Sequence, residues 1–331
     1  MQERTLGRTA TAVGVIGLGA WQLGADWGEV DEDQAFATLG AAVEAGVTFI
    51  DTADVYGDGR SERIIGAFRR SLGSQPAHTR LTVATKMGRR APLELAQYTL
   101  DHFREWTDRS RENLGMDTLD LVQLHCPPSI VYSTDQVFDD LDTLVQEKRI
   151  AAYGVSVEST AEALTATARP GVATVQIIFN MLRLKPLDEA LPAARKAGVG
   201  IIVRVPLASG LLSGRYDEHT TFAADDHRTY NRHGEAFDQG ETFAGVDYDT
   251  GLEAVRRLAP LKPEGATMAQ FALRWIIDHP AVSVVIPGAR NPAQARLNVE
   301  AAALDPLSAD VHDQVAAVYD ELIRPSVHSR W

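Results

Sequence analysis

The chain has 331 residues, of which 45% are hydrophobic and 23% are charged, a composition typical of a globular protein with a large core. Its formal net charge of −13 argues against a nucleic-acid-binding surface, which needs clustered Lys and Arg. Cys126 is the only cysteine, which excludes an intrachain disulfide and a cysteine-based metal cluster.

The N-terminal segment has weak signal-peptide character, because Arg4 and Arg8 precede the apolar stretch TAVGVIGLGAWQLGA. Glycines at positions 14, 17 and 19 interrupt that stretch, and it reads equally well as a hairpin followed by a core strand. No run of 18 apolar residues exists, so a membrane span is not expected. We therefore expect a cytoplasmic protein.

After a short hairpin (ERTL, a Gly-Arg turn, then TAVGV), apolar runs typical of strands alternate with amphipathic helical patterns. The predicted strands are 15–19, 47–51, 80–86, 119–125, 150–156, 173–180, 200–205 and 282–287. The helical patterns between and after them are 31–46, 61–73, 98–115, 134–148, 160–168, 187–198, 266–280 and 291–303.

Eight strand-and-helix repeats predict an α/β fold, a closed (β/α)8 TIM barrel that forms a single domain over residues 1–331. The alternative is a doubly wound nucleotide-binding sheet, suggested by VIGLGAWQLG. Its glycine fingerprint fails, because Gln22 stands where the third glycine belongs.

Two segments depart from this alternation. Residues 213–250 are polar, lack periodicity and follow the seventh strand, so they predict a long functional loop over the mouth of the barrel. Residues 308–331 predict an extra C-terminal helix and a tail that ends in Trp331. Together with the 126–135 loop, these parts are expected to set substrate specificity.

Three predicted strands end in polar residues: FID in Asp51, LTVATK in Lys86 and LDLVQLH in His125. Tyr56 follows Asp51 by five positions in the turn-rich stretch TADVYGDGR. Each residue alone has an ordinary explanation, as a helix cap, a strand-end lysine, a core histidine or a loop aromatic. Because consecutive parallel strands end at the same edge of a sheet, we expect the four side chains to meet.

Together these groups suit proton transfer to a carbonyl oxygen. An ammonium beside a phenol stabilises phenolate and lowers the pKa of the phenol, so Lys86 would activate Tyr56. Asp51 would hold and orient the ammonium. His125 would donate a hydrogen bond to the carbonyl oxygen and orient the substrate.

The chain resembles the aldo-keto reductase superfamily, whose members are (β/α)8-barrel oxidoreductases that prefer NADP(H). The resemblance runs from the Leu6-Gly7-Arg8 hairpin to about residue 303, in family order. Its segments are GVTFIDTADVYGDGRSERIIG (46–66), TKMG (85–88), LVQLHCP (121–127), YGVS (153–156), VQIIFN (175–180), VPLASGLLSGRY (205–216) and VIPGARNPAQARLN (285–298). It implies a catalytic tetrad of Asp51, Tyr56, Lys86 and His125, with Tyr56 as the general acid/base.

The resemblance also implies a cofactor site. Ser156, Gln176 and Asn180 match residues that bind the nicotinamide carboxamide, although Gln176 and Asn180 could instead bond within the barrel mouth. Arg204 stands where many relatives stack an aromatic ring on the nicotinamide, and a planar guanidinium can also stack. The positions that match the loop along the pyrophosphate are Leu207, Ser209, Gly210 and Leu212.

The segment IPGARNPAQARLN leads into a helix N-terminus, which favours an anion. By resemblance Gly288 permits close backbone approach and Arg290 binds the 2′-phosphate. Gln294 and Asn298, one helical turn apart, would reach the adenosine. We therefore expect NADPH/NADP+ as the cofactor, in preference to NADH.

Other residues receive weaker functional interpretations. His219, His227 and His233 lie in the polar loop without compact ligand spacing, so no metal site is expected. Cys126 borders the predicted pocket but has no base of its own, which argues against a nucleophile. Trp21 matches substrate-contacting aromatics of relatives, whereas core packing explains Trp27 equally well.

The sequence thus predicts reversible NADPH-dependent reduction of an aldehyde or ketone to an alcohol. Two alternatives stay open: a sugar or alcohol dehydrogenase that uses NAD(P)+, and a cofactor-sensing binding module like the potassium-channel β subunits of the same superfamily. The expected partner is a small carbonyl or alcohol substrate, with neither nucleic acid nor membrane. Substrate identity and oligomeric state are not predicted.

Overall fold

A computed structural model of the chain describes residues 1–24, 31–73 and 81–331. One eight-stranded sheet has the order β10-β9-β8-β7-β6-β5-β4-β3, and each neighbouring pair is parallel. Parallel bridges from Ile16 to Val285 and from Gly19 to Gly288 join its two edges. The predicted (β/α)8 barrel is thereby confirmed. Its strands are β3 (Leu18–Gly19), β4 (Phe49–Asp51), β5 (Thr82–Met87), β6 (Leu121–His125), β7 (Tyr153–Ser156), β8 (Val172–Ile178), β9 (Gly200–Arg204) and β10 (Val282–Val285).

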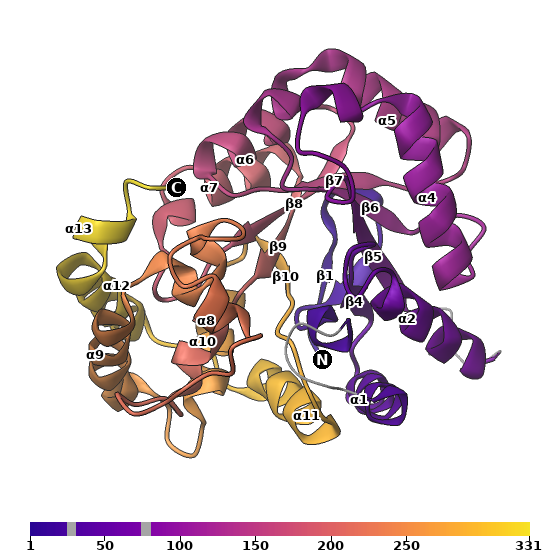
Figure 1. The fold of residues 1–331 in the computed structure, drawn as a ribbon. Coiled ribbons are helices and arrows are strands. Elements are labelled where there is room, and N and C mark those ends of the chain that lie inside the picture. The colour runs from indigo at the N-terminus through magenta and orange to yellow at the C-terminus, as the bar shows by residue number, and fades with distance from the viewer. Residues whose placement is uncertain (25–30, 74–80) are drawn as a thin grey trace.

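Helices surround the barrel (Figure 1), and residues at their ends explain where several begin and stop. Ser159 and Thr267 each form a capping box with the residue three positions on, while Gly115 and Gly198 end helices in the left-handed conformation. The helices are α1 (Glu32–Glu44), α2 (Arg60–Ser71), α4 (Leu100–Leu114), α5 (Asp135–Gln146), α6 (Thr160–Thr167), α7 (Ala190–Ala197), α10 (Met268–Ile277) and α11 (Pro292–Glu300).

The apolar core has two layers. The larger layer lies between the sheet and the helices. A smaller cluster fills the barrel interior with the side chains of Leu6, Val13, Phe49, Ala84, Leu121, Ile202, Val284 and Ile286. A filled barrel leaves the strand ends as the place for a site.

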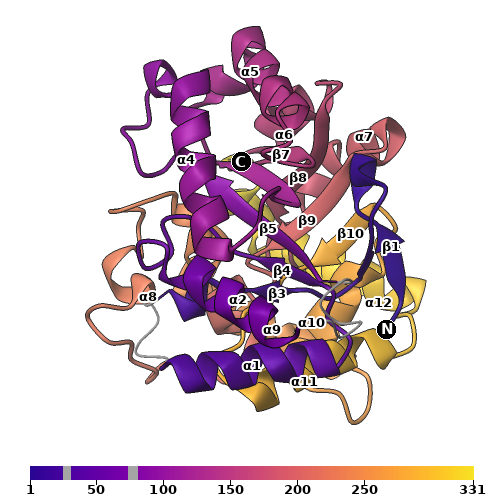
Figure 2. The same cartoon turned by 90° about the vertical axis from the view of Figure 1, so that its right-hand side faces the viewer.

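The predicted N-terminal hairpin is present as β1 (Glu3–Thr5) and β2 (Ala12–Gly14), which pair antiparallel. In Figure 2 it lies at one end of the barrel, and α8 (His227–Tyr230) lies at the other. The guanidinium of Arg4 ties the hairpin to the carbonyl oxygens of Ile277, His279 and Val282 at 2.6–3.1 Å. Because the hairpin covers one end, the cavity opens at the other.

The segment after β9 is more ordered than its polar composition predicts. It contains α8 and the short 3-10 helices η7 (Gln239–Glu241) and η8 (Phe243–Gly245). It continues into α9 (Tyr248–Leu258), which the sequence analysis missed and which buries Leu252, Val255 and Leu258. The predicted extra C-terminal helix is confirmed as α12 (Ala309–Leu322), followed by α13 (Arg324–Val327). Within the described ranges, no helix is both long and apolar enough to cross a membrane.

Candidate active site

Three of the four predicted catalytic residues lie at the carboxyl ends of adjacent strands. Asp51 ends β4, His125 ends β6, and Lys86 is the penultimate residue of β5. The parallel register pairs Asp51 with Ala84 and Lys86 with Gln123, which sets the heights of the side chains in the barrel. The predicted gathering of these side chains is therefore present.

Tyr56 reaches the same place on a turn that follows β4. The amide of Asp54 donates to the carbonyl of Lys86 at 3.1 Å, which fastens the turn to the neighbouring strand. Gly57 has a φ of +57°, and a Cβ there would lie 1.8 Å from the carbonyl oxygen of Gly24. Only glycine permits this backbone approach, so the Tyr-Gly pair is a structural requirement of the turn.

The ammonium of Lys86 lies in the centre of the group. It forms an ion pair with Oδ1 of Asp51, in which the two side chains are 1% and 3% exposed. It also donates to the carbonyl of Thr52 at 2.9 Å and to Oη of Tyr56 at 3.5 Å. Lys86 can therefore act on the phenol while Asp51 fixes its position, the arrangement expected from the sequence.

The second oxygen of Asp51 binds two amides inside the barrel. Nε2 of Gln123 donates to Oδ2 of Asp51 at 3.0 Å, and Nε2 of Gln176 donates to the same oxygen at 2.8 Å. Gln123 was not singled out from the sequence, although its position two residues before His125 on a parallel strand places it one layer below the site. The two amides fix the carboxylate and satisfy its buried charge.

The protonation of the group follows from burial and neighbouring charge. Burial raises the pKa of Tyr56, and the field of Lys86 works against that rise. Burial alone would lower the pKa of Lys86, but Asp51 and Tyr56 raise it above its ordinary value. Lys86 is therefore a permanent cation beside a phenol that keeps its proton.

His125 is neutral in this environment. Burial holds its pKa well below the usual range, and Arg89, Lys86 and Arg204 add to the effect. Its ring meets that of Tyr56 edge to face at a centroid distance of 5.9 Å. A neutral imidazole next to the phenol can donate one hydrogen bond without competing for the proton.

Aromatic rings form one wall of the site. Trp21 stacks on Tyr56 at 6.0 Å between centroids, and it contacts His227 at 5.2 Å and Phe237 at 6.1 Å. Trp21 thus lies beside Tyr56, and its predicted contact with substrate stays a prediction. Trp27 falls outside the described residues. His227 is buried, whereas His219 and His233 are exposed.

A cavity of about 660 Å³ extends from this group along the mouth of the barrel. Most predicted cofactor residues line it: Gln176, Arg204, Leu207, Ser209, Gly210, Gly288, Arg290, Gln294 and Asn298. Ser156, Asn180 and Leu212 are absent from the described lining. Nδ2 of Asn180 donates to the carbonyl of Val205 at 2.9 Å, and Ser156 accepts from the thiol of Cys126 at 3.3 Å, so both side chains stabilise the barrel mouth.

The far end of the cavity is the N-terminus of α11. Asn291 caps the helix by accepting from the amide of Gln294 at 2.9 Å, and Gln294 in turn accepts from the amide of Arg290 at 2.8 Å. The guanidinium of Arg290 is exposed and has no ion-pair partner among the described residues. A helix N-terminus beside a free guanidinium is suited to a phosphate group.

Backbone strain coincides with the cavity. Cys126, Val205 and Ser209 have φ angles of +47°, +51° and +53°, which side-chain-bearing residues rarely adopt and a β-branched valine adopts least. Each lies directly after a strand or within the loop that follows β9. Strain of this kind persists where the surrounding structure fixes a functional geometry.

A buried ionic cluster adjoins the tetrad and was not predicted. Arg204 contacts Glu241 at 2.5 Å and Glu158 at 3.5 Å, and Arg89 contacts Glu158 at 3.1 Å. Glu241 comes from the segment after β9 and Glu158 from the loop after β7. No motif or periodic pattern predicted this cluster, because the loops meet only in the folded chain.

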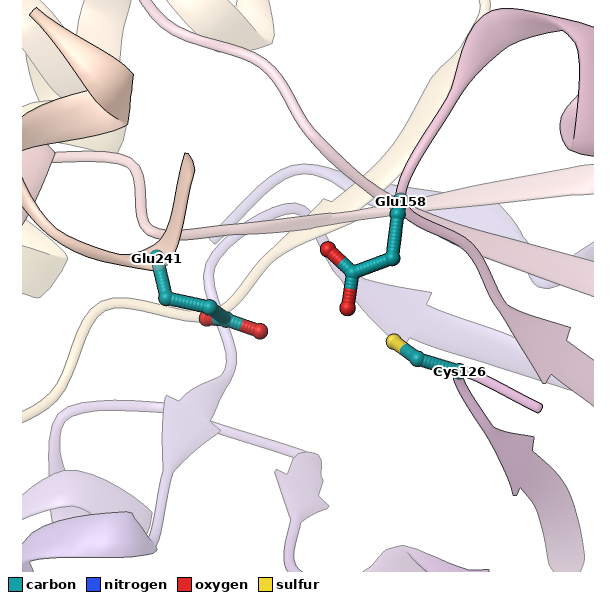
Figure 3. A group of neighbouring side chains, drawn as sticks. All are labelled: Cys126, Glu158 and Glu241. Carbon is teal, nitrogen blue, oxygen red and sulfur yellow. The ribbon is translucent and has the colours of Figure 1, made fainter. Parts of the chain in front are cut away.

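Cys126, Glu158 and Glu241 point toward one another, and their ligand atoms lie within 4.8 Å (Figure 3). The guanidinium of Arg204 binds both carboxylates and supplies the positive charge that a metal ion would supply. Burial raises the pKa of Cys126 to about 12, so the thiol is protonated and is a poor ligand and nucleophile. We interpret the group as an ion-pair cluster.

The fold and site define a (β/α)8-barrel protein whose polar groups converge at the carboxyl ends of the strands, where barrel enzymes carry out chemistry. Comparison with known proteins agrees, because residues 15–320 match the Aldo/keto reductase family. The chain therefore belongs to the aldo/keto reductase family, a family of oxidoreductases, as its motifs predicted.

Individual relatives span nearly the whole chain. The aldo-keto reductase YhdN of Bacillus subtilis is 29% identical over 297 residues, which cover 89% of this chain and 86% of that protein. A probable voltage-gated potassium channel subunit beta of Oryza sativa subsp. japonica is 30% identical to this chain, and the match covers 96% of each protein. The holo form of the aldo-keto reductase AKR11C1 of Bacillus halodurans has the same fold, with a TM-score of 0.78, 24% identity and 99% coverage of both chains.

Proposed function

We propose that the protein catalyses NADP(H)-dependent reduction of an aldehyde or ketone to an alcohol, with Tyr56 as the proton donor. The observation that carries this proposal is the buried group of Tyr56, Lys86, Asp51 and His125 at the mouth of an elongated cavity. The reaction is reversible, because the same phenol can accept the proton of an alcohol.

The residues along the cavity fit a nicotinamide dinucleotide. Gln176 and Arg204 offer an amide and a planar guanidinium near the tetrad, and Arg290 offers a cation at the helix N-terminus. A Cβ on Gly288 would lie 2.2 Å from Nε2 of Gln22, so a side chain there would displace that of Gln22. When bound, the nicotinamide supplies the hydride in reduction and accepts it in oxidation.

The chain's own residues then handle the proton. Tyr56 gives its proton to the carbonyl oxygen as negative charge develops there, and Lys86 at 3.5 Å stabilises the phenolate that remains. Neutral His125 orients the carbonyl through a hydrogen bond. Asp51 holds Lys86 and is itself held by Gln123 and Gln176.

The test is the Tyr56→Phe variant, assayed with NADPH and a panel of aldehydes and ketones by the loss of nicotinamide absorbance. We expect kcat to fall by about 100-fold or more, the usual range for a lost general acid. NADPH affinity, measured by fluorescence titration, should change little. Tyr248→Phe is the matched control, because the hydroxyl of Tyr248 donates to the carbonyl of Asp217 and Tyr248 does not line the described cavity.

Retention of near-wild-type kcat by Tyr56→Phe would refute the proposed mechanism. Initial rates in both directions distinguish a reductase from a dehydrogenase that works mainly toward alcohol oxidation. Replacing NADPH by NADH in the same assay tests the cofactor preference, which we attribute to Arg290. Equal kcat/KM with both cofactors would contradict that attribution.

A second candidate function is a cofactor-sensing subunit of a larger assembly. It is favoured by the 30% identity to a protein described as a potassium channel subunit beta. Such a role predicts very slow turnover across the carbonyl panel together with tight retention of NADP(H). Turnover at rates common for enzymes, about 1 per second or faster, would exclude it as the main function.

A further inference from the structure

The side chain of Arg204 is held in place by residues outside the barrel strands. Its Nη1 contacts Oε1 of Glu241 at 2.5 Å, and its Nη2 donates to the carbonyl of Val157 at 3.0 Å. Glu158 is the more distant partner at 3.5 Å, and burial raises the pKa of Glu158 to about 7. Because its carboxylate is 1.0 Å nearer than that of Glu158, Glu241 is the principal partner of this buried cation.

Glu241 is presented by a turn that also holds the neighbouring part of the cavity wall. We call residues 238–245 the clamp turn. Oγ of Ser209 donates to the carbonyl of Glu241 at 2.9 Å and accepts from the amide of Phe243 at 3.1 Å. Arg204 and Ser209 both line the cavity, so the clamp turn fixes two parts of its wall together.

The clamp turn is anchored on its other side by Trp331. The indole Nε1–H donates to both carboxylate oxygens of Asp238 at 3.0 and 3.1 Å. The ring lies so close to Gly245 that a Cβ there would be 2.2 Å from Cη2 of Trp331. Arg330 supports this contact by donating to Oε1 of Gln239 at 2.8 Å.

A buried arginine connects the indole to the ionic cluster. The guanidinium of Arg183 stacks on the ring of Trp331 at 4.0 Å and donates to the carbonyl of Glu158 at 2.8 Å. A Cβ on Gly240 would lie 2.2 Å from Nη1 of Arg183, so the clamp turn packs directly on this guanidinium. Trp331, Arg183 and the clamp turn therefore form one packed stack behind the side chains of Glu158 and Glu241, which face each other in Figure 3.

We propose that Trp331 is a positioning residue for NADP(H): it fixes the clamp turn, keeps Glu241 on Arg204, and so slows release of the bound cofactor. The proposal rests on the proposed function, in which Arg204 and Ser209 contact the cofactor. It adds a contact between Trp331 and Asp238, which lie 93 positions apart in the sequence. Loss of the indole would free the turn while the strand and turn that carry Lys86 and Tyr56 keep their own contacts.

The experiment measures NADPH release from the full-length protein by stopped-flow fluorescence. Trp331→Ala and Asp238→Ala should each accelerate release by about tenfold, because effects of this kind fall mainly on the dissociation rate. Asp238→Asn should restore nearly the wild-type rate, since its oxygen still accepts from the indole. The single-turnover rate of carbonyl reduction with saturating NADPH should stay within about twofold of wild type.

Two further variants locate the effect. Glu241→Gln, which removes the negative charge that faces Arg204 but leaves the tail intact, should release NADPH as fast as Trp331→Ala. Arg324→Ala is the matched control, because Arg324 in the same tail bonds to Asp320 and His328 and does not contact the clamp turn. Its release rate should equal that of wild type.

The outcomes separate this proposal from the proposed function. A wild-type protein that neither binds NADPH nor reduces any carbonyl overturns the proposed function. Wild-type binding with unchanged release from Trp331→Ala and Asp238→Ala overturns the role of Trp331. Fast release from Trp331→Ala with unchanged release from Glu241→Gln overturns the path through Arg204. Thermal unfolding of each variant verifies that it is folded. If Trp331→Ala fails to fold, the comparison of Asp238→Ala with Asp238→Asn decides whether the contact with the indole slows NADPH release.

Discussion

At the residue scale, Asp54 is the least satisfied group near the proton donor. Its side chain is 1% exposed, and neither carboxyl oxygen has a side-chain hydrogen-bond partner among the described residues. Burial and the nearby charge of Glu62 raise the pKa of Asp54 to about 7, against the opposing influence of Arg90, Arg109 and the Val55 amide. A buried carboxylate in this condition lowers the stability of the fold.

The pH dependence of this effect has a definite sign. Because the folded pKa of Asp54 lies above its usual value of 3.8, the folded state is favoured at low pH and loses stability as pH rises toward about 7. We predict that Asp54→Asn unfolds at higher urea concentration than wild type at pH 8 but not at pH 4. The gain in the free energy of unfolding that Asp54→Asn shows over wild type should be larger at pH 8 than at pH 4 by on the order of 2–4 kcal/mol.

The control for Asp54→Asn is Asp305→Asn on the exposed surface, which should change the free energy of unfolding by less than about 0.5 kcal/mol at both pH values. An equal change in stability at pH 4 and pH 8 for Asp54→Asn would show that this carboxyl does not titrate with a raised pKa.

At the element scale, the turn after β4 places Tyr56, and its geometry depends on Gly57. We predict that Gly57→Ala lowers the free energy of unfolding by about 2 kcal/mol or more, because φ is positive and the new Cβ meets the Gly24 carbonyl. Activity should fall as well, since relief of the clash displaces the phenol from Lys86. Urea denaturation and the NADPH assay measure both effects.

Gly40→Ala provides the comparison for Gly57→Ala. Gly40 lies inside α1, where a Cβ would have nothing within 4 Å, so alanine should stabilise the protein by about 0.5–1 kcal/mol. If Gly57→Ala behaved like Gly40→Ala, the close approach of the turn to Gly24 would not be a constraint on the site.

The tetrad was predictable from the sequence because strand ends are local signals. Asp51, Lys86 and His125 each close an apolar run, and parallel neighbours bring such ends together without any knowledge of loop structure. Trp21 and the α11 end of the cavity followed from motifs whose spacing is short. In these cases periodicity and chain order contain the necessary three-dimensional information.

The cluster behind the tetrad was not predictable by the same means. Glu158, Glu241 and Trp331 come from three loops far apart in sequence, and their meeting depends on packing between those loops. The helix α9 was missed because its first turn looks like the polar segment before it, while its buried face is formed by later residues. The amide of Asn180 donates to the carbonyl of Val205, a contact that only tertiary geometry decides, and its predicted cofactor contact stays a prediction.

At the scale of the whole molecule, stability and function are placed at opposite ends of the barrel. The hairpin covers one end and α8 lies at the other (Figure 2). The cavity is lined by residues at the carboxyl ends of the strands and by Arg228 and Tyr230 of α8. The residues that line the cavity therefore do not depend on the contacts of the hairpin, provided that the strands of the barrel stay paired. Arg4 tests this separation, because it fastens the hairpin to the loop between α10 and β10.

We predict that Arg4→Met lowers the free energy of unfolding by about 1–3 kcal/mol, since carbonyl oxygens of Ile277, His279 and Val282 lose a charged donor in a partly buried place. The affinity for NADPH should stay within about twofold of wild type, because the cofactor cavity lies at the other end. Arg296→Met is the control: its surface contact with Glu44 at 3.5 Å should contribute at most about 1 kcal/mol. A loss of NADPH affinity in Arg4→Met that matched its loss of stability would mean that closure of the barrel and the shape of the cavity are coupled along the full length of the strands.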